Sequence, residues 1–275
     1  MLEAINKKEL NFIQVLSMAI TLFMQNKKGI LMIVVMLFFP ISILNVLILE
    51  NMSNSAMAVY GMMQSGMFGG TPESGEALLQ FFKMHGLQMA VFVFLEPVGI
   101  ISVAKLVKSS LVKETVPLSQ ILGEAVNCLG GLILTGIPYL LLSFGGMMAF
   151  VLPGVYLLFI WTFYVYAIGL SGKKGWKALE YSRILVKGRF WKTAGSILII
   201  ALVGFSWNWI LEGVYLLLPA HIGTDIFYNT LTYIVYSFAF TAMTILFLNR
   251  EAVVLGKVHT ATEGPMEENK EHTED

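Results

Sequence analysis

Six runs of about twenty mostly apolar residues, separated by short polar segments, constrain this chain more than any other feature of its sequence. A helix rises about 1.5 Å per residue, so each run is long enough to cross roughly 30 Å of hydrocarbon. The runs predict transmembrane helices at residues 29–49, 87–107, 131–150, 152–170, 194–217 and 226–248. Because only 13% of the residues are charged, an ordinary soluble domain is excluded. We expect an all-α integral membrane protein.

The segment ahead of the first run, residues 1–28, is predicted to be an amphipathic helix lying in the membrane interface. Lysine pairs stand near both of its ends, and apolar residues recur between them at helical spacing. The first run itself is longer than the roughly 7–15 apolar residues of a secretory signal. We therefore expect a retained membrane anchor, although Ala56-Met57-Ala58 superficially matches a signal-peptidase site.

The segments between and after the runs give further expectations. Residues 51–86 form the longest connection and predict a loop with a short interfacial helix at 77–84. The third and fourth runs abut at Val151-Leu152-Pro153-Gly154, where proline and glycine predict the turn of a hairpin. A second interfacial helix is expected at 117–128. The acidic segment 251–275 is predicted to be a disordered tail, because it has few apolar residues to bury beyond 259.

The distribution of lysine and arginine orients the predicted helices. Basic residues lie before the first run and after the second, fourth and sixth runs, whereas Lys83 alone falls in a segment on the other side. Short cytoplasmic loops retain basic residues and translocated loops lack them. The sequence therefore predicts a multi-pass protein of the cell membrane with both termini in the cytoplasm.

Polar residues within the apolar runs predict a candidate intramembrane site. Glu96 lies near mid-depth in the second run, and Asn208 and Ser237 in the fifth and sixth runs fall at a similar depth. Glu212 lies near the outer interface on the same row of the fifth run as Asn208. An ionisable group in hydrocarbon is costly and indicates either a solute or proton path or interhelical hydrogen bonding. Both interpretations remain open, and the second is favoured because no basic residue lies at that depth.

A basic and aromatic segment between the fourth and fifth runs predicts contact with lipid headgroups. Its cations are Lys173, Lys174, Lys177, Arg183, Lys187, Arg189 and Lys192. They alternate with apolar and aromatic side chains, as in helices that lie on an anionic leaflet. The expected partners are anionic membrane lipids, together with a protein partner or a second copy of the chain. Nucleic acid is not expected, because the segment adjoins two membrane helices.

Part of this pattern resembles a known family. The residues that carry the resemblance are Pro153, Gly154, Val155 and Tyr156, followed by Gly175, Trp176, Ala178, Leu179, Ser182, Leu185, Lys187, Gly188, Phe190 and Trp191. Over about residues 10–250 the chain resembles the membrane domain of glycerophosphoryl diester phosphodiesterases and the YciC-like, uncharacterised bacterial membrane proteins. Members that hydrolyse diesters use a separate soluble barrel with His, Glu and Asp metal ligands, which this sequence lacks. The resemblance therefore implies a membrane domain without phosphodiesterase activity.

No catalytic residue, metal site or cofactor is predicted. Cys128 is the only cysteine, the four histidines are not clustered, and neither a His-Glu-x-x-His nor a Gly-x-Ser-x-Gly motif occurs. We expect a non-catalytic protein that organises, anchors or regulates a membrane partner or local lipid. The alternative is a transporter or lipid-handling protein that uses the polar faces of the second, fifth and sixth runs.

Overall fold

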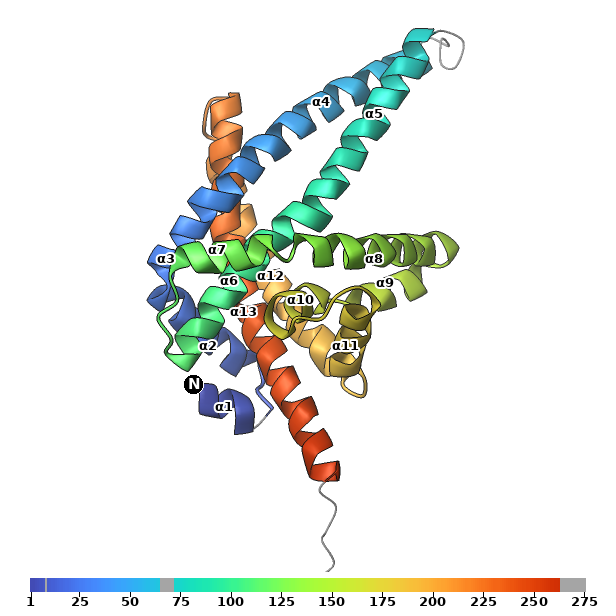
Figure 1. Ribbon diagram of the computed structural model, residues 1–275. Coiled ribbons are helices and arrows are strands. Elements are labelled where there is room, and N and C mark those ends of the chain that lie inside the picture. The colour runs from blue at the N-terminus through green and yellow to red at the C-terminus, as the bar shows by residue number, and fades with distance from the viewer. Residues whose placement is uncertain (8, 65–71, 263–275) are drawn as a thin grey trace, which may run out of the picture.

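The computed structural model describes residues 1–7, 9–64 and 72–262, and within these ranges the chain is helical without a strand (Figure 1). The helices are α1 (Leu2–Lys7), α2 (Phe12–Gln25), α3 (Lys27–Ile33), α4 (Phe39–Gln64), α5 (Pro72–Ala90), α6 (Glu96–Val112), α7 (Leu118–Val126), α8 (Leu129–Ala149), α9 (Val151–Ile160), α10 (Tyr164–Ser171), α11 (Trp176–Val186), α12 (Phe190–Tyr215) and α13 (Ile222–Thr262). Two π-helical turns, η1 (Val34–Phe38) and η2 (Val91–Leu95), join α3 to α4 and α5 to α6.

Six helical segments in the described part of the chain are long and apolar enough to cross a membrane. They are Lys27–Gln64, Gly75–Val112, Leu129–Ala149, Val151–Ser171, Phe190–Tyr215 and Ile222–Gly256. The first two each contain a π-helical turn, and the fourth contains α9 and α10. The predicted all-α fold with six membrane-spanning segments is therefore confirmed.

Helix α13 lies at the centre of the molecule and packs against α2, α4, α6 and α12 (Figure 1). Its contact face combines large apolar side chains with small hydroxyl residues, among them Ser237, Thr241 and Thr244, all fully buried. Each of these three hydroxyls donates to the carbonyl four residues earlier in α13, at 2.7–2.8 Å. The hydroxyls are thus satisfied within their own helix and leave a narrow surface on which neighbouring helices approach closely.

The N-terminal segment forms two helices instead of the single helix predicted for residues 1–28. Asn11 caps α2 by accepting the Gln14 N–H, and the Gln14 side chain accepts the Asn11 N–H in return, so the new helix starts here. Asn249 of α13 accepts the Leu10 N–H at 3.0 Å and donates to the Ile5 carbonyl at 2.7 Å. The break between α1 and α2 is therefore attached directly to α13.

The segment 51–86 differs from the predicted loop. Helix α4 continues to Gln64 and α5 begins at Pro72, so the two form a long antiparallel hairpin that extends beyond the body of the molecule (Figure 1). The polar residues here support the helix, since Asn51 donates to the Leu47 carbonyl and Ser55 to the Asn51 carbonyl. The short helix predicted at 77–84 is part of α5, and residues 65–71 lie outside the described residues.

The hairpin predicted between the third and fourth spans is present, but its break lies at Phe150, where the backbone is extended. Pro153 falls in the first turn of α9, where a missing N–H costs no helical hydrogen bond. Gly154 allows α8 and α9 to approach closely, because a Cβ at this position would lie 2.6 Å from the Met147 backbone nitrogen. The tip exposes large apolar side chains, with Met148 86% and Leu152 83% exposed, and projects sideways from the body (Figure 1).

The boundary at residue 251 for the disordered tail is too early, because α13 continues through Thr262. The first of the added turns has tertiary contacts: Ser171 and Tyr181 both donate to the Glu251 carboxylate, at 2.6 and 2.5 Å. Composition alone did not reveal these partners, which lie 80 and 70 residues away in sequence. Residues 263–275 of the predicted tail lie outside the described residues.

Helix α6 approaches η1 closely at Gly99. A Cβ at this position would lie 2.3 Å from the ring of Phe38, which is fully buried and stacks on Tyr233 with ring centroids 4.5 Å apart. The ring of Phe38 is thus enclosed between α6 and α13. No larger side chain fits at position 99 unless one of these elements moves.

We predict that Gly99→Ala lowers the free energy of unfolding by about 1–3 kcal/mol, because the added methyl group overpacks the Phe38 ring. The measurement is the midpoint of thermal unfolding in detergent. Gly195→Ala in α12 is the control, since a Cβ there meets nothing within 4 Å. This change should be neutral or stabilising by up to about 1 kcal/mol through helix propensity. Equal losses in the two variants would contradict the packing argument.

Candidate functional site

Glu96 lies in a hydrogen-bonded group of four polar side chains, which we call the Glu96 network: Asn45, Gln88, Glu96 and Tyr233. The Tyr233 hydroxyl donates to Glu96 Oε1 at 2.7 Å, and the Asn45 amide donates to the Tyr233 oxygen at 2.9 Å. Gln88 Nε2 donates to Asn45 Oδ1 at 3.2 Å. Asn45 and Tyr233 are only 8% and 5% exposed. The network therefore joins three of the six spans through buried polar contacts.

Two π-helical turns position the network. In η1 the Phe39 N–H donates to the Val34 carbonyl, and in η2 the Glu96 N–H donates to the Val91 carbonyl, each five residues earlier. Pro40 and Pro97 follow directly after Phe39 and Glu96. Proline lacks an N–H and clashes with the carbonyl four residues back. The wider π-helical turn that precedes each proline relieves this clash. Such turns are frequent at functional sites, which makes Glu96 a candidate functional residue.

The structure brings Glu96 together with residues other than those predicted alongside it. Asn208 is half-buried on α12, and its Oδ1 accepts from the Thr232 hydroxyl at 3.3 Å. Glu212 is exposed on the same helix. Ser237 is fully buried and donates to the Tyr233 carbonyl of its own helix. Because α12 packs chiefly on α13 and not on α6, the fifth span supplies no hydrogen bond to Glu96.

Asn45 lies on a span that was not expected to contribute to the candidate site. It is an amide inside the apolar first run, which was interpreted only as an anchor. A buried amide between Leu44 and Val46 is a signal of an interhelical partner, because an unpaired amide in hydrocarbon is costly. The first span therefore contributes to the network where the fifth was expected.

A second candidate site is a groove between α9 and α11, which we call the α9–α11 groove. Two adjoining cavities of about 320 and 130 Å³ share Tyr156, Ile160 and Arg183 as lining residues. Together the remaining lining residues are Leu157, Trp161, Trp176, Leu179, Glu180, Val186, Lys187, Gly188 and Phe190. The groove thus combines four aromatic rings with two cations and one carboxylate.

The basic residues predicted to contact lipid headgroups fall into distinct environments. Arg183 and Lys187 line the α9–α11 groove, and neither forms an ion pair with a described residue. Lys173 lies 5.5 Å from the centroid of the Tyr181 ring, Lys177 is exposed, and the stem of Lys174 lies beside Gly131. Arg189 and Lys192 instead pair with a carboxylate. The seven residues are therefore not equivalent.

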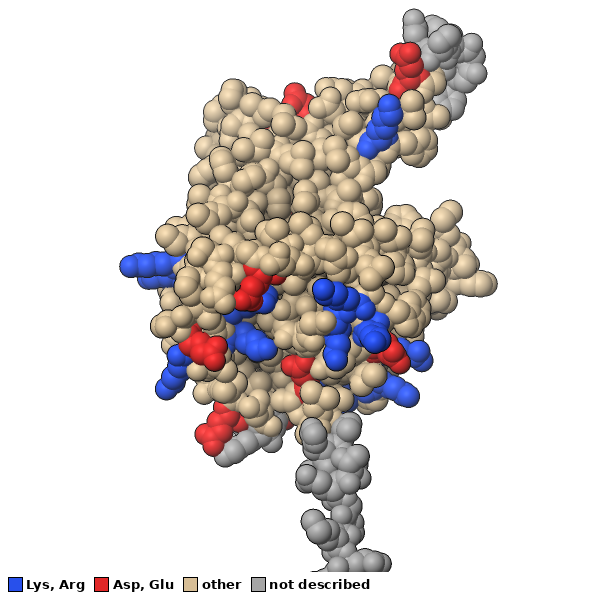
Figure 2. Space-filling model, in the orientation of Figure 1, with Lys and Arg blue, Asp and Glu red and all other residues tan. Residues whose placement is uncertain are grey.

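That carboxylate is Glu9, which pairs with Arg189, Lys192 and Arg250 in what we call the Glu9 cluster. Arg250 is only 1% exposed, so its charge depends on this partner. The cluster joins the segment before α2 to α12 and α13. We call the part of the molecule that holds this cluster, α1, α11 and the last turns of α13 the basic end. Lysines and arginines gather on its surface (Figure 2).

Other polar contacts join α7 to α6 and α11 to α13. Hydrogen bonds from Lys105 and Gln120 keep the pKa of the Glu124 carboxyl on α7 below its ordinary value, so it stays ionised. Burial, reinforced by the Glu251 carboxylate, raises the pKa of the Tyr181 hydroxyl, which therefore remains a donor. Burial also raises the pKa of the Cys128 thiol, which stays protonated at neutral pH.

No family model matches the chain, and neither a curated protein nor a solved structure is significantly similar to it. The resemblance to the membrane domain of glycerophosphoryl diester phosphodiesterases stays a prediction. Among the described residues, no group of three or more His, Cys, Asp and Glu side chains is placed to hold a metal ion.

We predict that Tyr233→Phe destabilises the protein by about 1–3 kcal/mol, because it removes the donor to Glu96 and the acceptor for the Asn45 amide. The midpoint of thermal unfolding in detergent measures the effect. Tyr236→Phe, on the same helix, is the control, because the Tyr236 hydroxyl forms no hydrogen bond with a described residue. It should change stability by less than about 0.5 kcal/mol. A loss as large in Tyr236→Phe would show that the network is not the cause.

Proposed function

We propose that this chain is a non-catalytic, multi-pass membrane protein that binds anionic lipid at its basic end and so organises the lipid around it. The observation that carries this proposal is the α9–α11 groove. Its two cations, Arg183 and Lys187, have no ion-pair partner among the described residues, and they adjoin aromatic side chains. An acidic headgroup supplies the missing partner.

The composition of the groove suits a phospholipid at the interface. Trp161, Trp176 and Tyr156 offer apolar faces with polar edges, the combination that favours the level of the headgroups. Arginine binds phosphate oxygens in a forked geometry, and each cation near an anionic leaflet adds about 1 kcal/mol of attraction. Glu180 is the only carboxylate that lines the groove, so the cations outnumber it.

The proposed orientation places the basic end in the cytoplasm of a cell whose plasma membrane holds the protein. Helix α1 and the last turns of α13 both lie at this end (Figure 1). Few charged side chains lie on the opposite half of the face drawn in Figure 2, which agrees with the tendency of translocated segments to lack lysine and arginine. Both termini then lie on the cytoplasmic side.

The test is native mass spectrometry of the protein released from membranes that contain phosphatidylglycerol and phosphatidylcholine. We expect one or more phosphatidylglycerol molecules to remain bound to the native protein. In the double variant Arg183→Gln with Lys187→Gln, the retained fraction should fall by about tenfold, because two headgroup contacts are lost. Arg189 and Lys192 are left unchanged, since their loss would disturb the Glu9 cluster.

The control removes the same number of charges elsewhere. Lys28→Gln with Lys113→Gln changes two exposed lysines, neither of which lines the α9–α11 groove. This variant should retain phosphatidylglycerol as the native protein does. Equal lipid loss in both double variants would indicate general attraction to the leaflet and would end the proposal of a groove-specific site. Retention of a stoichiometric protein in place of lipid would favour an accessory subunit.

A second candidate function is proton-coupled transport through the Glu96 network. Two observations favour it: the only carboxylate in the network lies directly after a π-helical turn, and it is followed by proline. Ionisable residues inside membrane bundles often serve proton relays. The hydrogen bonds from Tyr233 and Asn45 give Glu96 neighbours through which a proton could pass.

Proteoliposomes with an entrapped pH dye test this function. Under an imposed pH gradient, the native protein should increase proton flux over empty vesicles, and Glu96→Gln should abolish the increase because glutamine cannot carry the proton. Glu212→Gln, which removes an exposed carboxylate from α12, should behave as the native protein does. If native protein and Glu96→Gln give the same flux, Glu96 has a structural role and transport by this route is rejected.

A further inference from the structure

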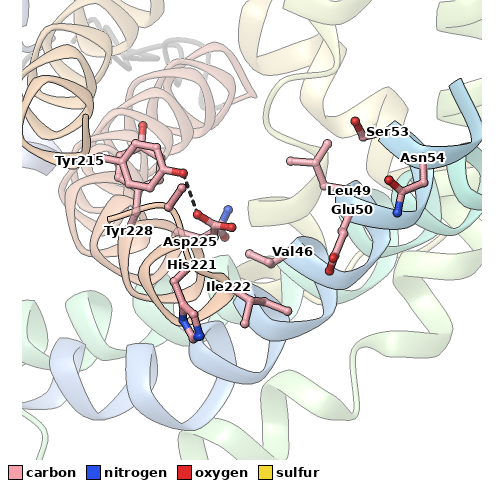
Figure 3. Close-up of a pocket in the computed structure, with 12 residues that line it drawn as sticks. Val46, Leu49, Glu50, Ser53, Asn54, Tyr215, His221, Ile222, Asp225 and Tyr228 are labelled. Carbon is pink, nitrogen blue, oxygen red and sulfur yellow. Dashed lines mark hydrogen bonds between the residues drawn. The ribbon is translucent and has the colours of Figure 1, made fainter. Parts of the chain in front are cut away.

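A cavity of about 620 Å³ lies at the end of the molecule opposite the basic end, between α4 and the turn that joins α12 to α13 (Figure 3). Its polar lining residues are Glu50, Ser53, Asn54, Tyr215, His221, Asp225, Tyr228 and Asn229, and its apolar ones are Val46, Leu49, Ala220 and Ile222. This volume falls within the range of sites that hold small molecules. The cavity is not part of the α9–α11 groove or of the Glu96 network.

The charges that line the cavity are negative. Glu50 and Asp225 supply two carboxylates, and no lysine or arginine is among the lining residues. Glu50 forms no hydrogen bond or ion pair with a described residue, whereas Asp225 Oδ1 accepts the Tyr215 hydroxyl at 2.6 Å. His221 Nδ1 accepts the Gly223 N–H at 3.0 Å. The cavity therefore favours a cation.

The same lining favours an organic cation over a metal ion. Ca²⁺ requires six to eight oxygen ligands, yet no group of three or more His, Cys, Asp and Glu residues in the described part of the chain is placed to hold a metal. The ring centroids of Tyr215 and Tyr228 lie 4.6 Å apart. Val46, Leu49 and Ile222 add apolar surface to the cavity. Aromatic faces and aliphatic side chains suit the substituents of an alkylammonium group, and carboxylates suit its charge.

We propose that this cavity binds an organic ammonium group, with Glu50 and Asp225 opposing its charge and the Tyr215 and Tyr228 rings contacting its alkyl substituents. The cavity extends along α4 and α13 toward the Glu96 network: Val46 follows Asn45 directly, and Asn229 lies about one helical turn before Tyr233. The site is independent of lipid binding in the α9–α11 groove.

Calorimetric titration with phenyltrimethylammonium tests the proposal on the full chain in dodecyl maltoside, a detergent without charge or ammonium. We expect saturable binding to the native protein. Glu50→Gln and Asp225→Asn should each weaken it by about fivefold or more, since each removes one opposing charge. Both changes are mild, because Glu50 is exposed and the asparagine oxygen still accepts the Tyr215 hydroxyl. Circular dichroism confirms that each variant is folded.

The controls separate a specific site from general attraction. Glu212→Gln removes a nearby carboxylate of α12 that does not line the cavity, and it should leave binding unchanged. Benzenesulfonate, an aromatic anion of similar size, should not bind. Unchanged affinity in both Glu50→Gln and Asp225→Asn, equal loss in Glu212→Gln, or equal binding of benzenesulfonate would each overturn the proposal.

A last titration identifies the source of the ammonium group. The measurement is repeated in micelles that contain phosphatidylcholine, whose headgroup carries a quaternary ammonium. Competition with phenyltrimethylammonium identifies a lipid headgroup as the ligand, and unchanged affinity identifies a free organic cation. The Arg183→Gln with Lys187→Gln variant should bind the probe normally, so failure of the anionic-lipid proposal and failure of this one are distinguishable.

Discussion

The fold depends on one constraint: α13 must present a continuous surface to helices from both ends of the sequence. At its centre, Ser237, Thr241 and Thr244 keep that surface narrow because their hydroxyls are satisfied within the helix. At the basic end, Asn249 binds the backbone on both sides of the break between α1 and α2. Without a central helix of this length, the N-terminal helices and the Glu96 network would have no common support.

Much of the fold could be predicted because hydrocarbon leaves the backbone few choices. Apolar runs of sufficient length must be helical, so all six spans were found from composition and period alone. Helix ends were harder to predict, since they depend on contacts distant in sequence. Asn51 and Ser55 hydrogen-bond within α4 and carry it past the apolar run. In α13, Ser171 and Tyr181 bind Glu251 and so stabilise the first turn beyond the predicted end.

The candidate sites were less predictable for a related reason. Depth along a span can be read from sequence, but the face on which a helix meets its neighbours cannot. Glu96 and Asn208 were expected together because their depths agree, whereas α12 packs on another side of α13. The basic segment shows the same limit. Arg183 and Arg189 lie in the same basic segment, yet Arg183 lines the α9–α11 groove and Arg189 pairs with Glu9 near the N-terminus.

The two π-helical turns have a consequence for how this sequence can vary. A π turn holds one more residue than the α-helical turn it replaces, so η2 sets the rotation of α5 relative to α6. Deleting a single residue within η2 would restore the regular period and rotate Gln88 by about 100° relative to Glu96. The span would keep nearly its full length and apolar character, but Gln88 would no longer reach Asn45 in the Glu96 network. In these two spans, insertions and deletions of one residue are therefore more disruptive than most substitutions.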